Sequence, residues 1–118
     1  DQVRMQTILP GGSATYLCTL QNDGSRDDAF VVTGPAGTAE WQVRYSVPGL
    51  GDITDRVTGD GWITGRFAPG AWCPIMVQVS PKSTAAAGNA FHVKLLAISL
   101  TDAAQCDAVR GVTTLQAR

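Results

Sequence analysis

Apolar and polar residues alternate with a period of two along most of this chain. In residues 14–21, 41–45, 73–79 and 91–97 every second side chain is apolar, and polar residues occupy most positions between them. Such alternation is typical of β-strands with one buried face, whereas helical periodicity is nearly absent. The pattern therefore predicts an all-β protein.

Turn sequences rich in glycine, proline and asparagine separate the alternating segments, for example at residues 10–12, 22–24 and 68–70. Further strands are expected at residues 3–5, 30–33 and 108–115. The irregular segment 48–67 contains five glycines and is expected to hold loops and one weak strand. About seven to eight strands with frequent turns predict an antiparallel β-sandwich of the immunoglobulin-like kind.

Length and composition favour a single domain spanning residues 1–118. Hydrophobic residues make up 44% of the chain and the net charge is only -1, so nothing indicates nucleic acid as a partner. No run of 18 apolar residues is present, and we expect no membrane insertion. The polar start at Asp1 shows no signal peptide, so we expect a cytosolic protein or the mature part of a longer secreted chain, with the second preferred.

Catalytic motifs are not evident. His92 is the only histidine and shares a strand face with Lys94, so it is expected to face solvent. Neither a Gly-x-Ser-x-Gly elbow nor a phosphate-binding glycine loop occurs. Cys18 and Cys73 fall on apolar faces, which favours inert thiols or a disulfide bridge. We therefore predict no enzyme and no cofactor.

Asparagine and aspartate gather in the predicted loops. Weak calcium candidates there are Asp23, Asp27, Asp28, Asp52 and Asp55. None of these runs has the alternating spacing of a known calcium loop, so hydrogen bonding within turns is the preferred interpretation. Asn22 continues the inward parity of its strand, and we expect it to be buried with hydrogen-bond partners.

Two places favour an interaction role. Trp72 has the opposite parity to Cys73 and should point outward, where it would stack on a sugar ring, anchor an interface or cover the end of the sandwich. In the strand at residues 91–100, Leu96 and Ile98 make the second face apolar as well. That face is covered either by this chain's own segment 48–67, which is preferred, or by a neighbouring module.

Several short phrases, in order, resemble an immunoglobulin-like repeat family of bacterial surface and secreted proteins, related to NEW3 and CARDB-type sandwiches. They are Pro10-Gly11-Gly12, Gln21-Asn22-Asp23-Gly24, Gly34-Pro35-Ala36-Gly37 before Trp41-Gln42-Val43-Arg44-Tyr45, Gly61-Trp62, Ala68-Pro69-Gly70-Ala71 and Asp107-Ala108-Val109. The resemblance implies tandem repetition, export and a scaffold or adhesive role, without catalytic residues.

The three cysteines form no Cys-x-x-Cys pair, which argues against zinc. They leave open one disulfide with one buried thiol, or three free thiols. The strand order implied by the resemblance brings Cys73 and Cys106 to the same end of the sandwich. A bridge between these two is therefore preferred to one between Cys18 and Cys73.

Together these observations predict a structural or interaction module of an extracellular or cell-surface protein. Its expected partners are neighbouring copies or adjacent domains of the same protein. The alternative is a carbohydrate-binding or adhesive module that uses Trp72 to contact glycans.

Overall fold

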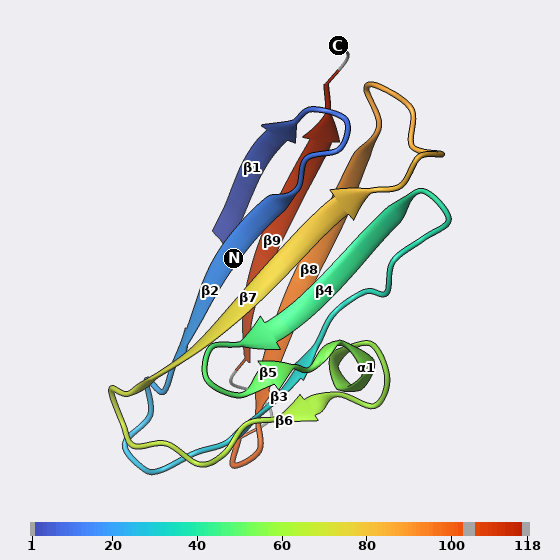
Figure 1. Ribbon diagram of the computed structural model, residues 1–118. Coiled ribbons are helices and arrows are strands. Elements are labelled where there is room, and N and C mark those ends of the chain that lie inside the picture. Colours follow the sequence, from blue (N-terminus) through green and yellow to red (C-terminus); the bar gives the residue numbers. More distant parts are fainter. Residues whose placement is uncertain (1, 103–105, 117–118) are drawn as a thin grey trace.

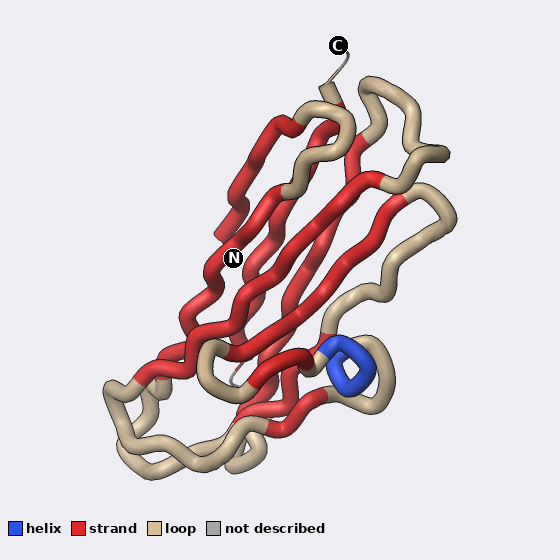
Figure 2. Tube along the Cα trace, viewed as in Figure 1, coloured by secondary structure: helices blue, strands red, loops and turns tan. Residues whose placement is uncertain are grey.

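Two β-sheets packed face to face form the domain, as the computed structural model shows over residues 2–102 and 106–116 (Figure 1). One sheet has the order β1-β9-β8-β3-β6 and the other β2-β7-β4-β5. The described residues form nine strands and one short helix: β1 (Gln2–Ile8), β2 (Ala14–Gln21), β3 (Phe30–Thr33), β4 (Trp41–Val47), β5 (Gly51–Asp52), α1 (Thr54–Val57), β6 (Trp62–Ile63), β7 (Trp72–Pro81), β8 (Ala90–Ser99) and β9 (Cys106–Leu115). Strands dominate the chain (Figure 2), and the predicted all-β sandwich is confirmed.

The strand order is that of an immunoglobulin-like sandwich. When β5 and β6 are left out, the second, fifth and fourth strands are neighbours in one sheet, and the seventh, sixth and third in the other. These neighbours pair antiparallel, whereas the first strand, β1, runs parallel to β9. β5 and β6 raise the number of strands above the expected seven to eight. Each is only two residues long, too short for any alternation to be recognised in the sequence.

The core lies between the inward faces of the two sheets. Tyr16 and Trp41 are each at most 4% exposed, as their parity predicts. Trp41 stacks on Phe91 of the opposite sheet with ring centroids 6.0 Å apart. The hydroxyl of Tyr16 donates to the carbonyl of Val112 at 2.9 Å and shares a second hydrogen bond with Thr113 Oγ1. Stacked rings and this hydroxyl therefore join the two sheets.

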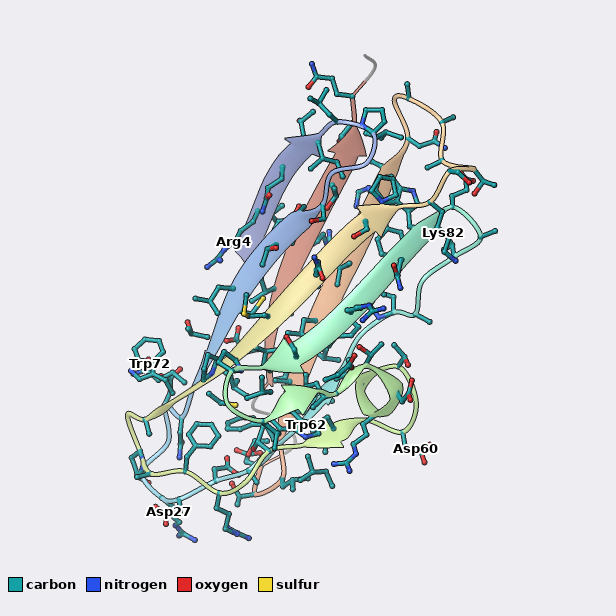
Figure 3. The ribbon with its side chains drawn as sticks, in the orientation of Figure 1. Arg4, Asp27, Asp60, Trp62, Trp72 and Lys82 are labelled. Carbon is teal, nitrogen blue, oxygen red and sulfur yellow. The ribbon has the colours of Figure 1, made fainter. Side chains whose placement is uncertain are left out.

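Segment 48–67 lies at the side of the sandwich and does not cross its outer faces. Helix α1 packs against β4 and β3, where Val57 is 1% exposed, and β6 extends the sheet beside β3. Trp62 on β6 is 6% exposed and belongs to the core (Figure 3). The expectation that this segment covers Leu96 and Ile98 is therefore wrong, because its residues fill the sheet edge instead.

Candidate interaction surfaces

The side chains considered for catalysis lie apart. His92 is exposed on the outer face of β8, as expected, whereas Cys18 and Cys73 face the interior from β2 and β7. Burial raises the pKa of both thiols above the usual cysteine value. At neutral pH they remain protonated, and a protonated thiol is a poor nucleophile.

Two of the five aspartates that are calcium candidates, Asp28 and Asp52, accept hydrogen bonds from within the domain. Asp28 is buried and accepts hydrogen bonds from Ser99 Oγ at 2.5 Å and from the amide of Ala29 at 2.7 Å. Asp52 accepts one from the amide of Thr54 at 2.7 Å, which is turn chemistry of the expected kind. Among the residues that the structure describes, no three His, Cys, Asp or Glu side chains are placed to hold a metal ion.

Asn22 is the buried side chain that holds the turn after β2. It is 1% exposed, and its amide donates to the carbonyls of Arg26 at 2.8 Å and Phe67 at 2.9 Å. Its Oδ1 accepts from the amide of Gly24 at 3.0 Å. One side chain thus ties the turn at Gly24 and Arg26 to the segment at Phe67, and the predicted burial with partners is confirmed.

All three cysteines are free in the structure. Cys73 pairs with Leu20 and faces the core, whereas Cys106 pairs with Ile98 on the outer face of the other sheet. Sheets packed face to face lie about 10 Å apart, and a disulfide needs Cα atoms within about 7 Å. The preferred bridge between Cys73 and Cys106 thus finds no support, although both lie near the same end of the sandwich as expected.

An exposed patch surrounds Trp72, which is 59% exposed where β7 begins and projects from the domain (Figure 3). The strand register places Gln21 opposite Trp72 and Thr19 opposite Pro74. We call this patch the Trp72 surface; it consists of Leu17, Thr19, Gln21, Trp72, Pro74 and Met76. It carries no charged side chain, and Leu17 is 47% exposed. The predicted outward orientation of Trp72 is confirmed.

The second surface is the outer face of the five-stranded sheet. Ile98 stands in register with Val31 and Cys106, and Ile63 continues the same row on β6. Two residues earlier on β8, Leu96 points to the same face and lies in register with Ala108 of β9. We call this the β8 face; its apolar members are Val3, Met5, Val31, Ile63, Leu96, Ile98, Ala108 and Val112. Its most exposed members lie on the edge strands: Met5 is 74% exposed, Ile63 59% and Val3 58%.

No protein-family model and no curated protein matches this chain. Among the described residues, no helix is long and apolar enough to span a membrane. The likeness to NEW3 and CARDB-type modules therefore stays a prediction from the sequence phrases.

Proposed function

We propose that this domain is a non-catalytic structural or interaction module of an extracellular or cell-surface protein, where it acts as a spacer, scaffold or assembly unit. The observation that carries the proposal is the apolar β8 face. The solvent-facing side of an antiparallel sheet normally carries polar residues. A contiguous exposed apolar patch instead marks a contact surface. Its proposed partners are adjacent domains or neighbouring copies of the same protein.

The location and the repeat character rest on the sequence. The ordered phrases that resemble bacterial surface modules support export and tandem arrangement. The immunoglobulin-like strand order is compatible with such modules, although the same fold serves many functions.

Labelling of Cys106 tests whether the β8 face is covered in the intact protein. Its thiol is exposed on that face, so a maleimide reaches it readily in the isolated domain. If the proposal holds, labelling in the intact protein on cells that produce it slows by about tenfold or more, because a bound partner excludes the reagent. Peptide mapping separates Cys106 from Cys73. Equal rates in both settings would refute coverage of this face.

The Trp72 surface favours a second candidate, a carbohydrate-binding or adhesive module. An exposed indole beside the uncharged Thr19 and Gln21 offers a stacking platform with hydrogen-bonding groups at its rim. A glycan array with the domain and with Trp72→Ala tests this function. Glycan binding by the domain that Trp72→Ala abolishes would support the carbohydrate-binding function. An array without any signal would contradict that function.

A further inference from the structure

Two positive side chains lie opposite each other in the middle of the β8 face. Lys94 on β8 is in register with Arg110 on β9, and Val3 on β1 is in register with Arg110. Directly opposed residues have Cβ atoms about 5 Å apart, a distance at which like charges repel. Within residues 2–102 and 106–116, neither side chain has an ion-pair or hydrogen-bond partner. The repulsion between the Lys94 and Arg110 side chains is thus not offset by an acidic partner among the described residues.

Apolar side chains lie on both sides of this pair along the strands. Toward one end Met5 and Val112 share a row with the exposed His92, and toward the other Leu96 and Ala108 share a row with Thr33. The outward positions of β1, β3, β6, β8 and β9 that the structure describes include no acidic residue. The face therefore combines mostly apolar side chains, together with His92 and Thr33, with an unmatched double positive charge at its centre.

Charge complementarity selects one kind of occupant. A second copy applied through the same face would oppose Lys94 and Arg110 to their own like charges, and such a contact is disfavoured. An anionic membrane is normally held by clusters of about four to eight basic residues, more than this face offers. A protein segment that carries a carboxylate between apolar side chains satisfies both the charge and the apolar rows, because Arg binds carboxylates with two parallel hydrogen bonds.

We infer that the β8 face binds a protein segment whose Asp or Glu carboxylate lies between Lys94 and Arg110. The flanking apolar side chains of that segment pack on Met5 and Val112 at one side and on Leu96 and Ile98 at the other. The inference rests on the proposed function and names the chemistry of the partner.

Three matched peptides test it by nuclear magnetic resonance titration of the isotope-labelled domain. They are acetyl-Ser-Leu-Ser-Glu-Ser-Leu-Ser-amide, whose Leu and Glu side chains share one face of an extended segment, and the same peptide with Gln or Lys at its centre. We expect the Glu peptide to shift the amide signals of β8 and β9 and to bind about fivefold or more tightly than the Gln peptide, with the Lys peptide weakest. Added salt should reduce this preference.

Charge reversal supplies the control. The double variant Lys94→Glu, Arg110→Glu should prefer the Lys peptide, whereas Arg44→Glu should keep the original order. Arg44 is a matched control because it is an exposed strand residue on the outer face of the other sheet.

Other results would overturn the inference. These are equal affinity for the Glu and Gln peptides, shifts confined to other strands, dimerisation through the β8 face, or binding to phosphatidylglycerol vesicles that the Glu peptide does not displace. The two proposals fail separately. If Cys106 is protected in the intact protein but the carboxylate gives no preference, only the partner chemistry is wrong. If Cys106 is equally reactive in both settings, coverage of the face is refuted as well.

Discussion

Ser99 donates a 2.5 Å hydrogen bond to the carboxylate of Asp28 across a sequence separation of 71 residues. The bond joins the end of β8 to the loop before β3. Ser99 Oγ also accepts the amides of Thr101 at 3.2 Å and Asp102 at 3.1 Å, so one hydroxyl organises the turn that follows β8. Both Asp28 and Ser99 are buried, at 5% and 2% exposure.

The hydrogen bond between Ser99 and Asp28 makes the stability of the folded domain depend on pH in the acidic range. The hydrogen bond from Ser99 lowers the pKa of Asp28 below its usual value; burial opposes the shift and the amide of Ala29 reinforces it. Because the folded pKa is the lower one, the carboxylate contributes stability above its unfolded pKa of about 3.9 and loses that contribution as the pH falls through the folded value. We expect Ser99→Ala to move the acid-unfolding midpoint to higher pH in a circular-dichroism titration. An unchanged midpoint would contradict the role of the bond.

Asn22→Ala should cost about 2–3 kcal/mol of unfolding free energy, because it leaves the carbonyl of Arg26 and the amide of Gly24 without their partner and removes one of two hydrogen bonds to the carbonyl of Phe67. Asn22→Asp should be destabilising at neutral pH and recover part of the loss in acid, since its carboxylate would face the carbonyls of Arg26 and Phe67. Urea unfolding at two pH values measures both. Asn89→Ala is the matched control: it removes one solvent-exposed hydrogen bond, to Glu40 Oε2 at 2.7 Å, and should cost no more than about 1 kcal/mol.

The sequence predicted the strands wherever one face is buried, since burial of every second residue is what alternation records. The parity of Tyr16, Asn22 and Trp72 gave their orientations correctly for the same reason. Only one weak strand was expected in segment 48–67, where the structure has β5 and β6, because strands of two residues carry no recognisable period. The position of segment 48–67 was misjudged because Val57 and Trp62 fill the sheet edge through tertiary packing, which no local pattern encodes.

The charged centre of the β8 face could not be found from the sequence. Lys94 and Arg110 meet only because β8 and β9 pair in one register, and Val3 joins them only because β1 runs parallel to β9. The register between two strands depends on how they pair, and the residue pattern of either strand alone does not determine it. The common end of Cys73 and Cys106 followed from the strand order that the resemblance implies, whereas their different sheets and opposite orientations emerge only from the packed sandwich.

Gly34 and Tyr45 should be energetically coupled. A Cβ at Gly34 would lie 2.6 Å from Tyr45 Oη, and that hydroxyl donates to the carbonyl of Pro35 at 2.8 Å. We expect Gly34→Ala to cost about 1–3 kcal/mol through overpacking and Tyr45→Phe about 1 kcal/mol. The double variant should lose less than the sum, because the phenylalanine lacks the atom nearest to the new methyl group.

A double-mutant cycle from urea unfolding measures this coupling. The control is Gly65→Ala, where a new Cβ would meet no atom within 4 Å, and it should stay within about 0.5 kcal/mol. Strict additivity of Gly34→Ala and Tyr45→Phe would show that the hydroxyl contact does not govern the site.

All three thiols should react as free cysteines with a thiol reagent. Protein unfolded without reductant should yield three reactive thiols, since the structure contains Cys18, Cys73 and Cys106 unpaired. In the folded domain Cys106 should react first and Cys18 last, following exposure and the burial that raises the pKa of Cys18. Cys18→Ser should cost about 1–3 kcal/mol by burying a hydroxyl. A count of one thiol in the unfolded, unreduced protein would instead establish a disulfide.

Trp72 and Trp62 should respond in opposite ways to truncation. Trp72 is 59% exposed, so Trp72→Ala should change the unfolding free energy by no more than about 0.5 kcal/mol. Trp62 is 6% exposed within the core, and Trp62→Ala should cost about 3–5 kcal/mol because the cavity cannot fully collapse. Thermal and urea unfolding of both variants measure the contrast. A large loss at Trp72 would mean that its indole covers the end of the sandwich, and the Trp72 surface would then be part of the fold and unsuited to hold a glycan.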